Sequence, residues 1–99
     1  MQTVGTLPNS APFDIARRDE LTRIVTVSGE IDINSEPELD AACATTGPLI
    51  IDMSRVSFID CSGLRCLLIA EKQSASLRLV SNAKVNRLLE LTDLTGYFS

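Results

Sequence analysis

Apolar and polar residues alternate along two segments near the start of the chain, which is the two-residue period of a half-buried β-strand. The clearest alternation covers residues 25–32, and a shorter one begins at Phe13. A polar turn at residues 18–20 separates the two segments. Because this connection is so short, the pattern predicts that the two strands form an antiparallel hairpin.

The apolar spacing changes to that of an α-helix after Ser35. Glu38 follows Ser35 by three residues, the form of a capping box in which the serine side chain caps the first helical turn. Leu39, Ala42 and Cys43 then recur at the spacing of one helix face. These positions predict a first helix that packs this face, including Cys43, in the core.

The second half of the chain predicts further strands and helices. Residues 49–53 are a nearly continuous apolar run, typical of a strand that is covered on both faces. Asp60 is placed to cap a second helix that buries a row of leucines. We expect another strand at residues 76–81, a third helix around residues 85–89, and a short last strand within residues 95–98.

The predicted elements follow the order ββαβαβα, with room for a terminal strand. Right-handed crossovers through the first two helices make the later strands parallel to one another. The sequence therefore predicts an α/β fold, a mixed sheet of four to five strands covered by helices. Residues 1–12 show no period and are expected to form a flexible leader, so that a single domain covers residues 13–99.

Composition argues against several classes of function. The 99 residues carry a formal net charge of −4 and build no basic face, which argues against nucleic-acid binding. The chain has no His, no phosphate-binding glycine-rich loop and no dinucleotide fingerprint, so we expect no enzyme, no cofactor and no metal site. The first residues lack a signal-peptide pattern, and no apolar run is long enough for direct membrane insertion. We therefore expect a cytoplasmic protein.

The three cysteines are an odd number, without the spacing of a metal site or a redox pair. Cys43 and Cys66 fall among apolar helix positions, where core packing is the expected role. If Cys61 and Cys66 share a helix, their Cα atoms lie ~8.7 Å apart, beyond the ~7 Å that a disulfide spans. We therefore expect reduced thiols and no bond between Cys61 and Cys66.

A turn with the sequence Asp60-Cys61-Ser62-Gly63 joins the apolar run to the second helix. In open α/β sheets, ligands and partners bind at the carboxyl ends of strands, where this turn is predicted to lie. Ser62 would occupy the second helical position with its hydroxyl near solvent, and Gly63 would leave the backbone beside it unobstructed. From the residues alone, the alternative is a purely structural turn in which Asp60 and Ser62 cap the helix.

Four motifs, in the order of the predicted elements, resemble those of the STAS domain family. They are Gly29-Glu30-Ile31-Asp32, Asp52-Met53-Ser54, Phe58-Ile59-Asp60-Cys61-Ser62-Gly63-Leu64 and Val85-Asn86-Arg87-Leu88-Leu89-Glu90-Leu91-Thr92. Within that family the chain is most similar to the bacterial anti-anti-sigma factors, also called anti-sigma factor antagonists. The resemblance extends from about Phe13 to Phe98.

This resemblance implies a protein-binding switch that regulates transcription. An unphosphorylated antagonist binds a serine-kinase type of anti-sigma factor and so frees a sigma factor. The same kinase then phosphorylates a serine that corresponds to Ser62, which ends the binding, and a phosphatase resets Ser62. By the same resemblance Asp60 orients the turn and Asp32 lies on the neighbouring loop. The implied partner-binding residues are Asp32, Ser35, Asp60, Cys61, Ser62 and Gly63.

The chain departs from the family pattern at Cys61, which replaces the first serine of the turn. The first helix and the stretch between the second helix and Ser76 are also shorter than usual, which leaves the partner's identity open. Two alternatives therefore stay open: a STAS subunit of a transporter or lipid-trafficking complex, and a thiol-based redox regulator that uses Cys61. Because helix N-termini tolerate anions, we expect a phosphate at Ser62 to act on binding rather than on the fold.

Overall fold

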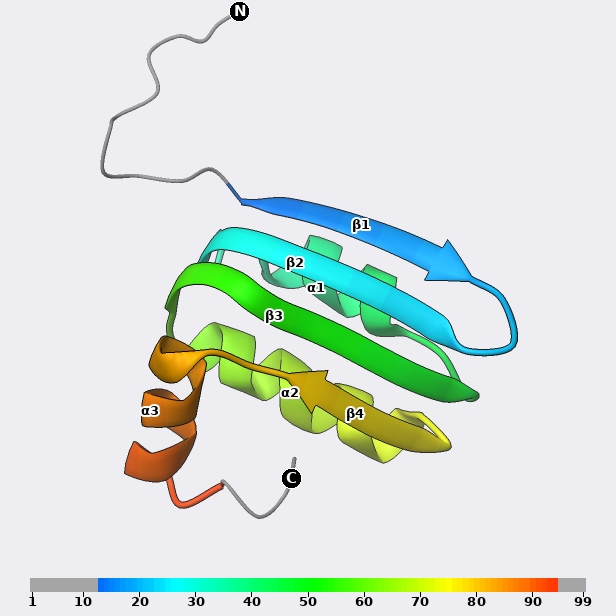
Figure 1. The fold of residues 1–99 in the computed structure, drawn as a ribbon. Coiled ribbons are helices and arrows are strands. Elements are labelled where there is room, and N and C mark those ends of the chain that lie inside the picture. The colour runs from blue at the N-terminus through cyan, green and yellow to red at the C-terminus, as the bar shows by residue number, and fades with distance from the viewer. Residues whose placement is uncertain (1–12, 95–99) are drawn as a thin grey trace, which may run out of the picture.

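The computed structural model describes residues 13–94 and shows the predicted order ββαβαβα (Figure 1). The elements are β1 (Asp14–Asp19), β2 (Arg23–Ile31), α1 (Glu36–Cys43), β3 (Pro48–Ile59), α2 (Cys61–Gln73), β4 (Ser76–Val80) and α3 (Ala83–Leu91). The leader expected at residues 1–12 and the last strand expected within residues 95–98 lie outside the described residues.

The strands lie in one sheet in the order β1-β2-β3-β4. β1 and β2 form the predicted antiparallel hairpin, whereas β2 pairs parallel to β3 and β3 pairs parallel to β4. The two parallel pairs arise because α1 and α2 carry the chain back across the sheet before each new strand begins. The mixed sheet predicted from the sequence is confirmed.

The apolar core lies between one face of the sheet and the helices. In Figure 1, α1 and α2 lie behind the sheet, and α3 lies at the end where β3 stops. Leu39, Leu67 and Val85 bring the predicted helix faces into this core and are at most 1% exposed. The buried side chains of the two central strands include Val25, Val27, Ile31, Leu49, Ile51 and Met53.

The helices have 8, 13 and 9 residues, and none in residues 13–94 is long and apolar enough to cross a membrane.

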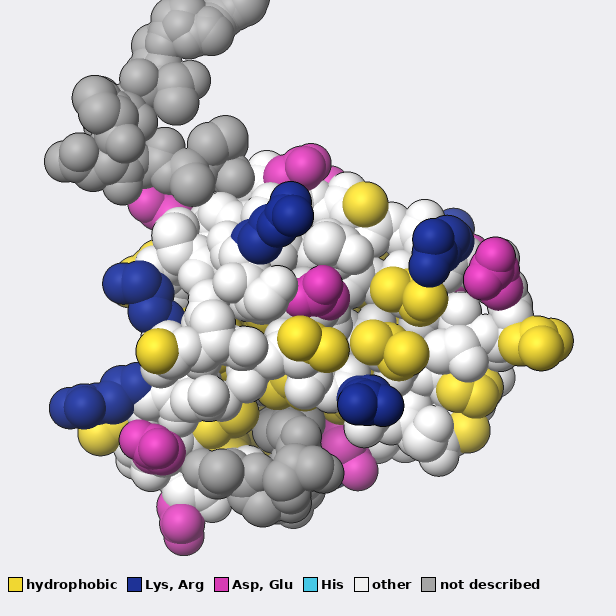
Figure 2. All heavy atoms as spheres, viewed as in Figure 1, with side chains coloured by type: hydrophobic (Ala, Val, Ile, Leu, Met, Phe, Trp, Pro, Cys, Tyr) yellow, Lys and Arg dark blue, Asp and Glu magenta, His cyan; other side chains and the backbone are white. Residues whose placement is uncertain are grey.

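The opposite face of the sheet carries no helix within residues 13–94, which corrects the prediction for residues 49–53. Leu49 and Ile51 are buried, but Ile50 between them is partly exposed. The apolar run predicts cover on both faces, whereas α1 and α2 both pack on the same one. Figure 2 views the open face and shows hydrophobic and charged side chains next to each other on it.

β3 is longer than predicted, because residues 54–59 continue the strand up to the start of α2. Its pairing with β2 shifts twice, between Asp52 and Arg55 and between Val56 and Phe58, and each shift adds one residue to β3. At the first shift the Asp52 carboxylate accepts the N–H of Ser54 at 3.0 Å. Hydrogen bonds from the Ser54 backbone and side chain hold the pKa of Asp52 below its usual value. Such bulges bend a strand, and Figure 1 shows β3 curving at its carboxyl end.

β1 also extends further than the sequence predicts, since Arg18 and Asp19 belong to the strand and the turn begins at Glu20. The Asp19 carboxylate accepts a hydrogen bond from Nε of Arg23 at 2.6 Å across the hairpin. Arg23 also donates from Nη1 to the carbonyl oxygen of Ala44 at 2.6 Å, which ties the hairpin to the end of α1. Two charged residues therefore continue the strand where polarity alone predicts a turn.

Gly29 lies at the second shift of β2 against β3 and has a φ of 86°, a conformation that side chains rarely adopt. We expect Gly29→Ala to lower the free energy of unfolding by about 1–2 kcal/mol, because a Cβ is strained at this φ. Gly47→Ala is the matched control, since a Cβ there meets only Oγ1 of Thr45 at 3.8 Å. Urea unfolding gives the stability of both variants. An equal loss of stability in the two would show that the positive φ of Gly29 does not require glycine.

Candidate functional site at the carboxyl edge of the sheet

The parallel strands β2, β3 and β4 stop at one edge of the sheet, and all three helices begin there (Figure 1). The turn at residues 32–35 follows β2, the turn at Asp60 follows β3, and residues 81–82 follow β4. In open α/β sheets this edge is where ligands and partners bind. Most of the residues that the sequence singles out lie on its first two turns.

Asp60 caps α2, as predicted. Its Oδ1 accepts the backbone N–H of Ser62 at 2.8 Å. Its carbonyl oxygen accepts the N–H groups of Gly63 and Leu64 at 3.1 and 3.3 Å. Since these contacts satisfy N–H groups that a helix start leaves without partners, Asp60 holds the first turn of α2 in place.

Ser62 is the second residue of α2, also as predicted. It is partly exposed, and its hydroxyl makes no hydrogen bond with any residue between 13 and 94. Cys61, the residue before it, is exposed and is not part of a disulfide. The turn therefore presents an unbonded hydroxyl and an exposed thiol on consecutive residues.

Gly63 is buried and packs toward the core. A Cβ at this position would lie 2.7 Å from Cγ1 of Ile59 and 2.8 Å from Cγ2 of Ile31, closer than Cβ atoms approach other heavy atoms. This corrects the expectation that Gly63 clears the backbone beside Ser62. The missing side chain instead lets the first turn of α2 pack against the ends of β2 and β3.

A backbone hydrogen bond joins the turns that follow β2 and β3. The N–H of Asp60 donates to the carbonyl oxygen of Ile31 at 3.3 Å, directly before Asp32. The Asp32 Oδ1 accepts the N–H of Asn34 at 2.9 Å and so shapes its own turn. The structure therefore brings Asp32 and Asp60, both partly exposed, onto adjoining turns.

Ser35 does not form the predicted capping box. Its side chain makes no cap hydrogen bond, and its backbone is helical rather than extended. The hydroxyl instead donates to the carbonyl oxygen of Glu30 at 3.3 Å and accepts the N–H of Asp32 at 3.4 Å. Ser35 is only 6% exposed, so it supports the turn from within.

Sequence reasoning missed two residues at this edge. Asn82 caps α3 by accepting the N–H of Val85 at 3.0 Å. Its amide also donates to the carbonyl oxygens of Val56 at 2.8 Å and Ser54 at 3.2 Å, which fixes α3 against β3. Phe58 is 50% exposed, although it stands beside the buried Ile59. An Asn directly before a helix is a recognisable capping signal, whereas the exposure of Phe58 has no signal in the sequence.

A family model of the STAS domain matches residues 13–98. The chain belongs to the STAS domain family. A crystal structure of an anti-sigma factor antagonist from Mycobacterium paratuberculosis shares 27% identity with a TM-score of 0.77, and the match covers 94% of this chain and 86% of that one. The anti-sigma factor antagonist SpoIIAA in its unphosphorylated form shares 19% identity with a TM-score of 0.66, covering 89% of this chain and 86% of that one, and supports the fold. No curated protein matches the sequence significantly.

The resembling motifs have identifiable structural roles in this STAS domain. Gly29 adopts the positive φ at the end of β2, and Asp52 binds the N–H of Ser54 at the first bulge of β3. Asp60 caps α2, and Gly63 allows its close approach to the sheet. Each of these residues shapes or supports the edge where the turns meet.

The two cysteines expected in the core of the STAS domain are there. Cys43 is 3% exposed and Cys66 is 1% exposed. Burial raises the pKa of Cys43 from 9.0 to about 12, and burial also raises the pKa of Cys66, so both thiols stay protonated. Within residues 13–94, no group of three or more Cys, Asp or Glu side chains could hold a metal ion.

The difference in exposure predicts the order in which the thiols react. At mildly alkaline pH we expect iodoacetamide to label Cys61 in the folded domain and to label Cys43 and Cys66 only after unfolding, because the buried thiols are neither accessible nor ionised. Peptide mass mapping measures the label on each residue. Labelling of Cys43 or Cys66 as fast as Cys61 in the folded protein would contradict this packing.

The cap at Asp60 predicts a pair of contrasting variants. We expect Asp60→Ala to lower the free energy of unfolding by about 0.5–2 kcal/mol, since the N–H of Ser62 then loses its acceptor. Asp60→Asn keeps an acceptor oxygen and should remain close to the parent. Chemical denaturation of both variants gives the comparison, and an Ala variant as stable as the Asn variant would show that the cap has no stabilising role.

Proposed function

We propose that this STAS domain is an anti-sigma factor antagonist. It binds an anti-sigma factor of the serine-kinase type and thereby frees a sigma factor, so it regulates transcription in the bacterial cytoplasm. Phosphorylation of Ser62 by that partner ends the binding, and a phosphatase resets Ser62. The domain is the acceptor of the phosphate and has no catalytic turnover of its own.

The observation that carries this proposal is the partly exposed Ser62 hydroxyl on the capped first turn of α2, which makes no hydrogen bond within residues 13–94. A phosphoacceptor must reach the active site of a kinase, and a partly exposed hydroxyl at the edge of the fold has that access. The likeness to an anti-sigma factor antagonist at 27% identity extends over almost the whole chain and supports the choice of partner.

The charge of a phosphate explains how one modification could end binding without unfolding the domain. A phosphoserine carries about −1.5 to −2 charges near neutral pH. At residue 62 it would lie beside the N-terminal end of α2, where the helix dipole is favourable to anions. A partner surface that fits the neutral serine would instead have to desolvate this charge, which is costly unless the partner pairs it.

The six residues implied by the family resemblance divide into two groups in this geometry. Asp32, Asp60, Cys61 and Ser62 are at least partly exposed and supply the proposed contact surface. Ser35 and Gly63 are buried and support that surface by holding the turns together. The proposed interface therefore has acidic groups around a neutral acceptor serine.

We expect Ser62→Ala to abolish phosphorylation and to leave binding to the partner intact, since only one hydroxyl is lost. Ser62→Glu should weaken binding at least ~10-fold, about 1.4 kcal/mol, because it places a carboxylate in the interface. Both variants should melt within a few degrees of the parent, as helix starts tolerate anions. Ser76→Ala is the matched control, since this exposed serine lies at the start of β4.

The experiment uses each kinase-type anti-sigma factor encoded in the genome that encodes this chain. Calorimetry gives the affinity, and intact-mass measurement after addition of ATP counts the phosphates. The proposal fails if no such kinase binds the parent protein. It also fails if Ser62→Ala is still phosphorylated to completion, or if Ser62→Glu binds like the parent.

A further inference from the structure

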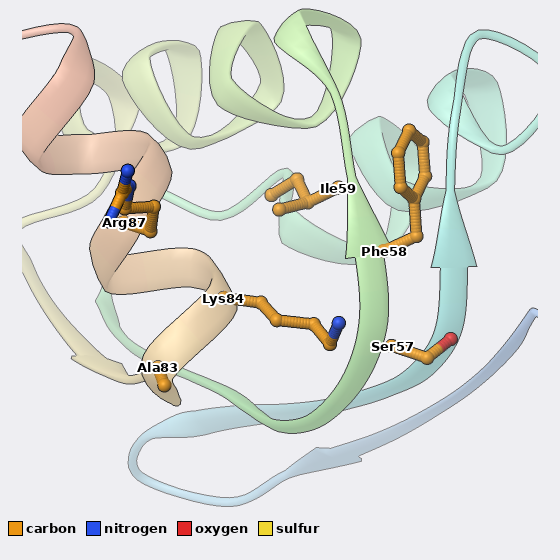
Figure 3. Close-up of a pocket in the computed structure, with 6 residues that line it drawn as sticks. All are labelled: Ser57, Phe58, Ile59, Ala83, Lys84 and Arg87. Carbon is orange, nitrogen blue, oxygen red and sulfur yellow. The ribbon is translucent and has the colours of Figure 1, made fainter.

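A groove of about 410 Å³ opens between the carboxyl end of β3 and the start of α3. Figure 3 shows Lys84 reaching from α3 toward β3, with Arg87 further along the same helix and Phe58 standing clear of the strand. The groove is lined by Ser57, Phe58, Ile59, Ala83, Lys84 and Arg87. It therefore combines an apolar strand end with two cationic side chains.

The two cations of the groove have no acidic partner within residues 13–94. Lys84 and Arg87 are exposed, and neither makes an ion pair or a side-chain hydrogen bond with any residue between 13 and 94. They are three residues apart on α3, so they lie on neighbouring positions of one helix face. In a chain with a net charge of −4, two unpaired cations at one groove form a local patch of opposite sign.

An exposed aromatic residue, Phe58, also lines the groove, and in Figure 3 its ring lies on the side of β3 away from α3. Phe58 is 50% exposed at the end of a strand, although burial of an aromatic ring usually stabilises a fold. Interfaces between proteins commonly place such a ring at their centre and surround it with polar and charged groups. The end of β3 and the start of α3 together supply both kinds of group.

The groove adjoins the turn that carries Ser62. Ile59 lines the groove, directly precedes Asp60, and fits against Gly63 in the first turn of α2. A partner that covers Ser62 is therefore close to the groove as well. The edge therefore carries acidic side chains at one place and basic ones at another. Asp32 and Asp60 lie on the turns, and Lys84 and Arg87 lie at the groove.

We propose that this groove is a second contact site for the anti-sigma factor and takes a segment that carries a carboxylate beside an apolar side chain. The inference rests on the proposed function and specifies the chemistry of the partner surface. The carboxylate pairs with Lys84 or Arg87 on the α3 side of β3, and the apolar side chain packs on Phe58 across the end of the strand. Charge complementarity at two places of opposite sign also fixes the orientation in which the partner docks.

Charge reversal in the groove tests this contact. The variant Lys84→Glu/Arg87→Glu is compared with Lys72→Glu/Arg78→Glu, which changes the net charge equally at two exposed residues away from the groove. The probe is the kinase-type anti-sigma factor that binds the parent protein, and calorimetry is run at low and at high salt. We expect the groove variant to bind at least ten-fold more weakly and the control to change less than three-fold. Phe58→Ala should also weaken binding, and this loss of affinity should depend little on salt, because the side chain is uncharged.

The affinities of the parent, the groove variant and the control distinguish the possible results. A loss of affinity confined to the groove variants, with melting temperatures close to that of the parent, supports the contact. If the kinase binds the parent, the groove variant and the control equally well, the groove is not part of the interface, while the proposed function stands. Equal losses in the groove variant and the control would assign the effect to net charge and overturn the contact. If no kinase binds the parent, the proposed function fails and this inference fails with it.

Discussion

The close approach of α2 to the sheet determines the geometry of the edge where the proposed function lies. At Gly63 the helix is packed against Ile31 and Ile59 so closely that a Cβ would collide with both. The backbone bond from Asp60 to Ile31 and the cap on Ser62 act over the same few residues. These contacts join the turns after β2 and β3, so the side chains that the two turns expose lie on one continuous edge.

This arrangement separates the groups that support the edge from the groups that face a partner. Two supporting groups are buried: Gly63 fits between strand ends, and the Ser35 hydroxyl satisfies backbone groups inside its own turn. Asp60 is partly exposed, and it both caps α2 and belongs to the proposed contact surface. The exposed groups carry the chemistry, with acids and the Ser62 hydroxyl on the turns and cations at the neighbouring groove. A charge added at Ser62 would therefore change what can dock there, and the packing beneath it would have no reason to rearrange.

Local sequence patterns predicted the parts of this structure that depend on residues close to one another in the sequence. Alternation identified β2, helical spacing identified the buried faces of α1 and α2, and Asp60 identified the start of α2. Other features depend on residues that meet only in the folded chain. The Ser35 hydroxyl turns to Glu30 because the loop brings that carbonyl near, and the bulges of β3 exist only relative to β2. The groove lined by Phe58 and Lys84 forms because Asn82 holds α3 against β3. No local sequence pattern predicts this contact.

We propose that phosphate on Ser62 changes binding while the fold stays the same. The most direct measurement incorporates phosphoserine at residue 62 during translation and compares the pure phosphorylated and unmodified proteins. Calorimetry with the kinase-type anti-sigma factor gives the affinities, and amide NMR spectra report the structure of both forms. We expect a loss of binding together with spectral changes confined to the turns at residues 32–35 and 60–63. Unchanged affinity, or changes that spread across the sheet, would contradict it.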